Sequence, residues 1–324
     1  YANIKVSYKK RIKILVIVSF FIFIIYLFET IPVLINNFQY NFWQTVNIAE
    51  NEGLIKENIL ISYGRNFIFS FFVLSYISYL IYPSKSNRNL FIYMFAIHST
   101  FLIFGARGGM FWAVLIMGFG YLIVNNNNNK EIFKILLLIF ILIVLIFVAT
   151  SFLKFVFDDQ NNPFDFIVKY FRIYFTTPPL AFVSYLNAPS ELLYGQNTFR
   201  FFIAVFDEIG FNLEAPSTVQ EFIYVYEDPT NVYTHLHYYA RDFGLIYAFI
   251  IQTLLGIIHG YFYLKVRVSN KTNLFQLSIY LFIYFPLVYQ FFYDQYFAIF
   301  STWLQIFIWS FLISRVFIRI EKEQ

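Results

Sequence analysis

Two histidines, an arginine and an aspartate stand close together in a chain that is 59% hydrophobic and only 13% charged. They lie in the stretch NVYTHLHYYARDFG, residues 231–244, as His235, His237, Arg241 and Asp242. Histidine has an ordinary pKa near neutrality, so it can accept a proton from a hydroxyl group. A guanidinium offers a rigid fork of donors that fits phosphate oxygens. The stretch therefore has the residue types for proton transfer beside an anion.

A helix through this stretch would divide the four groups between two faces. Asp228, which precedes a proline, is a candidate N-cap for such a helix. His237 and Arg241 are four residues apart, and His235 and Asp242 are seven apart, so each pair would share a face. A solvated cap at the membrane surface explains the same residues without any chemistry. Spacing alone leaves both interpretations open.

Three further arginines stand in aromatic or glycine-rich surroundings: Arg107 in GARGG, Arg172 in KYFRIYF and Arg200 in NTFRFF. Several arginines around one crevice would suit a diphosphate. Each one alone is also explained by a side chain that extends to lipid headgroups. The glycines beside Arg107 allow close approach of a ligand, which makes this arginine the strongest candidate of the three.

The elements that must position these residues are long apolar helices. The chain has 324 residues, 46 of them Phe, and a mean hydropathy of +0.61, which is more apolar surface than one soluble core can bury. The chain contains several apolar runs that are long enough to cross a hydrocarbon core about 30 Å thick as helices. We expect eight spans, at about 12–35, 64–82, 90–105, 109–124, 135–153, 243–264, 274–291 and 297–314. The expected fold class is therefore all-α, a polytopic membrane helix bundle.

The distribution of charge orients this bundle. The side that holds both termini carries 15 of the 23 Lys and Arg residues but 3 of the 19 Asp and Glu residues. The net balances of the two sides are +12 and −8, which add to the net +4 of the chain. Because basic loops stay in the cytoplasm, we expect both termini to be cytoplasmic.

One outer loop is much longer than the others and divides the chain into three parts. These are a five-helix membrane part at 1–153, the loop at 154–242, and a three-helix membrane part at 243–324. Apolar segments of the loop, at 164–175, 180–186 and 198–206, are too short to span. We expect them to form short interfacial or re-entrant helices. A loop of this length normally carries function.

Other sequence signals are weaker. His98 and His259 lie within expected spans, where we favour neutral packing residues over functional ones. Asp294, in an outer turn, is a candidate to face the same crevice as the opening stretch, or a plain turn residue. The chain has no cysteine and shows no zinc motif, P-loop, Gly-x-Ser-x-Gly or dinucleotide fingerprint. We expect no cofactor, no metal and no nucleic-acid partner.

The order of several motifs resembles the Wzy-type oligosaccharide repeat unit polymerases, the O-antigen and capsular polysaccharide polymerases of bacteria. GARGG lies between two short spans, and YFTTPPLAFVSYL and YGQNTF follow in the outer loop. NVYTHLHYYARDFG then leads into LIYAFIIQTLLGIIHGYFY. The resemblance covers about residues 90–300. It departs from the family pattern at His237, where many members have an arginine or another polar residue.

The resemblance implies glycosyl transfer at the outer face of the bacterial cytoplasmic membrane. A saccharide chain on undecaprenyl diphosphate would pass to a new lipid-linked repeat unit. It implies a diphosphate-binding set of Arg107, Arg172, Arg200 and Arg241, with His235 or His237 as the base and Asp242 as its orienter. Candidate partners are the lipid-linked oligosaccharides, membrane lipid and a chain-length regulator protein.

Two alternatives stay open. An O-antigen ligase shares the large loop and the arginine and histidine chemistry, whereas a lipid-linked oligosaccharide flippase would place its charges along a path at membrane depth. Most members of the polymerase family have more than eight spans. Since this chain starts with Tyr1, we expect its natural amino terminus to be missing.

Overall fold

The structure is a computed structural model. It describes residues 6–36, 59–103, 107–125, 128–155, 162–187, 191–216, 222–225, 228–268 and 273–318. The chain forms two compact units. Unit 1 comprises residues 1–159, 269–282 and 304–324, and unit 2 comprises residues 160–268 and 283–303. Residues 243–268 and 283–303, which fall in the expected last membrane part, group with most of the long loop in unit 2.

Unit 1 is built from long apolar helices. They are α1 (Val6–Asn36), α3 (Ile59–Ile81), α4 (Lys85–Ile103), α5 (Arg107–Val124) and α6 (Asn129–Phe155), with the first part of α12 (Leu274–Tyr289) and most of α13 (Phe300–Ile318). The most buried of them is α3, whose Phe71 and Phe72 are fully buried. His98 of α4 stacks on Phe69 and Phe72, with ring centroids 4.6 and 5.1 Å apart. This histidine therefore packs in the unit's aromatic core.

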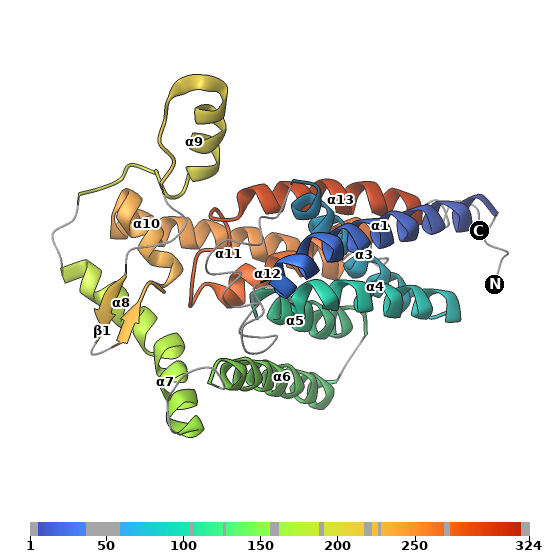
Figure 1. The fold of residues 1–324 in the computed structure, drawn as a ribbon, viewed down its shortest axis with the longest axis horizontal. Coiled ribbons are helices and arrows are strands. Elements are labelled where there is room, and N and C mark those ends of the chain that lie inside the picture. The colour runs from blue at the N-terminus through green and yellow to red at the C-terminus, as the bar shows by residue number, and fades with distance from the viewer. Residues whose placement is uncertain are drawn as a thin grey trace. The chain divides into compact units, whose positions relative to one another are not determined.

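Unit 2 holds the segments with candidate chemistry. Its elements are α7 (Pro163–Phe175), α8 (Thr177–Asn187), α9 (Arg200–Phe206), a π-helical turn (Asp207–Phe211), β1 (Ile223–Val225), β2 (Asp228–Thr230), α10 (His235–Phe243) and α11 (Leu245–Val268). Figure 1 shows α10 leading directly into α11. One hydrophobic cluster of unit 2 consists of Tyr238, Tyr239 and Ala240 of α10 and Ala248 of α11. Phe182 and Tyr185 of α8 pack against this cluster.

The helices confirm a membrane protein. In the described part of the chain, five helices are long and apolar enough to cross a membrane: Arg11–Asn36, Leu60–Ile81, Asn129–Ala149, Leu245–Val266 and Phe300–Phe317. Gly109–Val124 and Leu274–Tyr289 form shorter apolar helices. Each of the eight expected spans overlaps a helix over most of its length.

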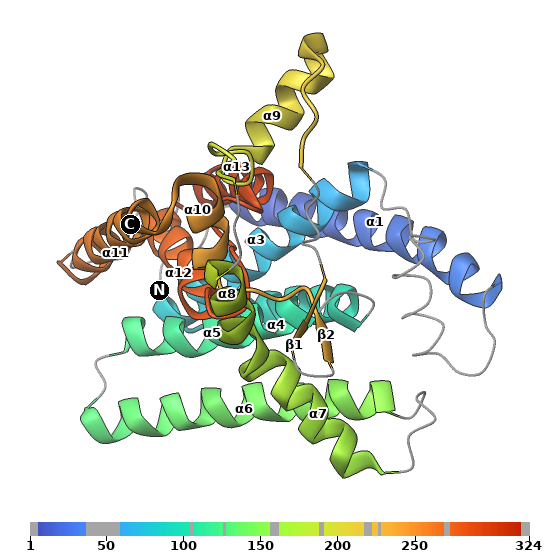
Figure 2. The same ribbon diagram turned by 90° about the vertical axis from the view of Figure 1, so that its left-hand side faces the viewer.

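Two features differ from the expected fold. The long loop contains α7, α8 and α9 close to the expected segments, but it also contains a small antiparallel hairpin in which Ile223 of β1 pairs with Thr230 of β2. The two strands lie side by side in Figure 2. Asp228 and Pro229 belong to β2, so the prediction that they start the helix of the opening stretch is wrong. Both residues pair with β1 across the hairpin, and α10 begins at His235, five residues after β2 ends at Thr230.

Candidate functional site

The site is organised by α10, a nine-residue helix whose inner side is buried. His235, His237 and Asp242 are all buried, with 6%, 2% and 0% of their surface exposed. The helix ends at Gly244, whose φ of 86° and ψ of 165° suit glycine and break the helix before α11 starts at Leu245. Consequently α10 places its polar groups at the end of a candidate membrane span.

Both ring nitrogens of His235 are occupied. Nδ1 lies 2.8 Å from the backbone oxygen of Gln290. Nε2 lies 2.7 Å from the side-chain oxygen Oε1 of Gln252 in α11. The same Gln252 donates a hydrogen bond to the side chain of Gln290 at 2.8 Å. His235 therefore ties α10 to α11 and to the turn after α12.

The imidazole of His237, unlike that of His235, is surrounded by aromatic rings. Its ring stacks on Tyr233 at 4.1 Å and meets Tyr185 edge to face at 4.7 Å and Tyr238 at 5.8 Å. Its Nδ1 is buried and has no hydrogen-bond partner among the residues that the structure describes. Burial in this box, followed by the positive charge of Arg241, lowers the pKa of His237 to about 3. The histidine is thus neutral at physiological pH and has a free acceptor or donor site.

Two arginines border the same group of aromatic rings. Arg241 acts on His237 through its charge, as their spacing of four residues predicts. Arg200, at the start of α9, donates from Nε to the backbone oxygen of Pro216 at 2.6 Å. Burial raises the pKa of Tyr293, and the positive charge of Arg200 opposes this rise. Tyr293 in turn packs edge to face on Tyr238 at 5.5 Å.

The carboxylate of Asp242 does not orient either histidine, so that expectation is wrong. One of its oxygens accepts from the backbone N–H and the side-chain amide of Asn197, at 3.1 and 3.0 Å. The other accepts from the backbone N–H and the hydroxyl of Thr198, at 2.6 and 2.7 Å. Four donors fill the carboxylate. Its role is to clamp the YGQNTF segment, and with it the start of α9, onto α10.

Asp294 is a second buried carboxylate with a structural role. It accepts from the hydroxyl of Tyr239 at 2.8 Å and from the backbone N–H groups of Tyr296, Phe297 and Ala298 at 2.9 to 3.1 Å. Burial raises its pKa, while these hydrogen bonds oppose the rise. Asp294 therefore holds the turn before α13 against α10, as the turn interpretation predicts.

The other two arginines have different positions. Arg172 is exposed near the end of α7. Arg107 begins α5 in unit 1, and its side chain lies outside the described part of the structure, as do residues 104–106 of the adjoining turn. No group of three or more metal-ligating side chains occurs in the described residues.

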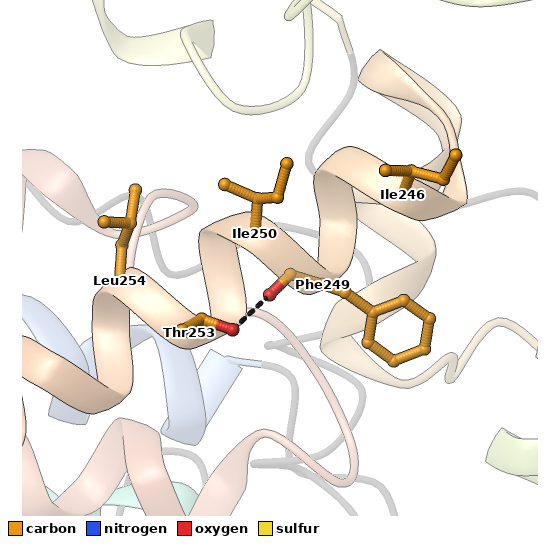
Figure 3. Close-up of a pocket in the computed structure, with 5 residues that line it drawn as sticks. All are labelled: Ile246, Phe249, Ile250, Thr253 and Leu254. Carbon is orange, nitrogen blue, oxygen red and sulfur yellow. Dashed lines mark hydrogen bonds between the residues drawn. The ribbon is translucent and has the colours of Figure 1, made fainter.

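Sequence reasoning missed the neighbours that distinguish the two histidines. Tyr185, Gln252 and Gln290 lie 17 to 55 residues from the histidines that they contact. Gln252 and Gln290 left a signal, since each is a polar residue inside an expected apolar span. A shallow apolar groove runs along α11 between Ile246 and Leu254 (Figure 3).

Comparison of the chain with protein-family models, with curated proteins and with solved structures gives no match. The resemblance to the Wzy-type polymerases therefore stays a prediction from residues and their order.

Proposed function

We propose that this chain polymerises lipid-linked oligosaccharide repeat units by glycosyl transfer at the outer face of the bacterial cytoplasmic membrane. The observation that carries the proposal is His237, a buried neutral imidazole whose Nδ1 has no hydrogen-bond partner in the described part of the chain, beside the cationic Arg241. An unsatisfied buried polar group is costly and commonly marks a functional position. An eight-span arrangement with the basic loops in the cytoplasm would put this pair at the outer face of the membrane.

In the proposed reaction, His237 accepts the proton of an acceptor hydroxyl on the lipid-linked repeat unit. The hydroxyl oxygen forms a bond to the anomeric carbon of the donor chain. The bond from that carbon to the diphosphate breaks, and undecaprenyl diphosphate leaves with the electron pair. Arg241 and Arg200 stabilise the charge that develops on this leaving group.

The low pKa of His237 fits this cycle. Without substrate, Arg241 disfavours a second positive charge on the neighbouring ring. A bound diphosphate neutralises Arg241 and adds negative charge, which raises the basicity of His237 when the substrate is present. Proton transfer is thereby favoured only in the loaded site.

We assign His237 rather than His235 to this role, because both nitrogens of His235 already have partners. Tyr185, half-buried over His237, is the ring whose movement admits the acceptor. The exposed aromatic side chains of the loop, such as Tyr194 and Tyr224, are candidates to stack on sugars.

Deletion of the gene, followed by analysis of surface and lipid-linked saccharides, tests this function. A polymerase predicts loss of long chains with single repeats still attached to the surface. An O-antigen ligase predicts long chains that remain on undecaprenyl diphosphate. A flippase predicts loss of all surface saccharide with lipid-linked units held inside. Either of the last two outcomes contradicts the proposal.

A further inference from the structure

Four large apolar side chains form an exposed stripe along α7. Phe164, Val168, Phe171 and Phe175 are 69%, 49%, 51% and 37% exposed. Their spacing of four, three and four residues places them on one face of the helix. Isolated exposed apolar residues are common, but a continuous stripe of this kind is a surface made for contact.

The remaining two sides of α7 have different character. The inner side packs within unit 2: Phe166 is 1% exposed, Tyr170 lies on it at 4.5 Å, and Tyr174 meets Phe292 edge to face at 6.5 Å. The third side, next to the stripe, carries the charged residues Asp165, Lys169 and Arg172. The helix thus has a protein-facing, an apolar and a charged side.

The apolar stripe lies beside the end of a candidate membrane span. Phe175, at the end of the stripe, packs edge to face on Phe292 at 5.5 Å. Phe292 follows Gln290 in the turn after α12, and Gln290 is hydrogen-bonded to Gln252 of α11. Gln252 lies seven residues into α11, roughly 10 Å from its start. The C-terminal end of α7, at Phe175, therefore lies near the level at which α11 would enter the membrane.

We propose that α7 is an interfacial helix that rests on the outer leaflet of the bilayer. The stripe Phe164, Val168, Phe171 and Phe175 enters the acyl boundary, and Lys169 and Arg172 lie at the level of the headgroup phosphates. Asp165, on the charged side one turn before Lys169, faces water.

The bilayer suits this surface better than a protein partner does. The stripe is bordered by cationic side chains at its middle and end, which matches anionic headgroups. The helix is also preformed, because Asn162 caps it and accepts from the N–H of Phe164 at 3.0 Å, with Pro163 at the first position. Lipid contact therefore requires no folding of α7. This proposal does not depend on the catalytic function.

Because the chain contains no cysteine, a single fluorescent label can be placed at will. Val168→Cys and Asp165→Cys, each carrying an environment-sensitive dye, are reconstituted in vesicles of phosphatidylethanolamine and phosphatidylglycerol. We expect lipids brominated on their acyl chains to quench the label at Val168 severalfold more than the label at Asp165. Aqueous iodide is expected to show the reverse order.

Equal access of iodide to both labels would overturn the proposal, since α7 would then lie in water. A label at Val168 that neither quencher reaches would also overturn it, because a protein surface would then cover the stripe. Phe171→Cys, on the same stripe, must repeat the result of Val168→Cys, and a different result at these two positions counts against an interfacial stripe.

Discussion

The two histidines of α10 differ in what their nitrogens can still do. Both nitrogens of His235 are in contact with polar atoms, of Gln290 and Gln252. His237 is surrounded by tyrosine rings, and its Nδ1 has no hydrogen-bond partner among the described residues. Two positions along one helix separate a structural from a candidate catalytic imidazole. The difference comes from the neighbouring elements, because residues two positions apart on a helix point in nearly opposite directions.

A pH-dependent stability should follow from His237. Its pKa is about 3 in the folded protein and near 6.5 when solvated, so between these values the unfolded chain binds one proton more. The free energy of unfolding should therefore fall as the pH drops below 6.5, by up to about 1.4 kcal/mol per pH unit. Melting temperatures of purified protein and of His237→Phe, measured from pH 7 to pH 5, should diverge, with the wild type losing more. Parallel curves would show that His237 is not buried as a neutral ring.

The residues of the site could be found from the sequence, but their roles could not. The stretch around His235 and Asp242 was identified from its residue types, and the shared face of His237 and Arg241 follows from helical spacing. The assignment of Asp242 was wrong because its partners lie about 45 residues away in YGQNTF. Contacts at such separations depend on tertiary packing, which local spacing does not encode.

At the level of elements, the short helices of the long loop were predictable and the hairpin was not. Apolar segments that are too short to span did become α7, α8 and α9. The hairpin strands have only three residues each, too few to show an alternating pattern. Asp228 and Pro229 belong to this hairpin and not to the start of the helix. As a result, α10 is shorter than predicted; it ends at Phe243, and Gly244 is its C-cap.

Gly244 should tolerate substitution poorly for a backbone reason alone. A Cβ at this position meets nothing within 4 Å, but its φ of +86° is unfavourable for any other residue. Gly244→Ala should destabilise the protein by about 1 to 3 kcal/mol, seen as a lower melting temperature. Gly256→Ala, in the helical interior of α11 with equally open space, is the matched control and should show no loss. Equal effects of the two changes would argue against a strained turn between α10 and α11.

At the level of the whole molecule, the apolar helices support placement in a membrane, and the number of spans determines the topology. Five helices meet the length and apolarity of a span, and α12 is one of the shorter ones. If all eight expected spans cross, 15 of the 23 Lys and Arg residues lie on one side of the membrane. The short helices therefore determine on which side the carboxyl terminus lies.

Labelling of single cysteines from outside intact cells can test this topology. Eight spans predict that Glu214→Cys in the long loop reacts with an impermeant maleimide, whereas Ser86→Cys and Gln324→Cys react only after permeabilisation. With five spans, Gln324→Cys would lie on the opposite side from Ser86→Cys. Reaction of Gln324→Cys in intact cells would contradict the eight-span arrangement.

We propose above that His237 and Arg241 act directly in glycosyl transfer. The most direct measurement is the length of surface polysaccharide in cells that express His237→Ala or Arg241→Ala at normal protein levels. We predict single repeats in both, whereas His259→Gln, which can still bond to Tyr296, should retain long chains. Long chains of unchanged length in both His237→Ala and Arg241→Ala would show that neither residue takes part in the transfer.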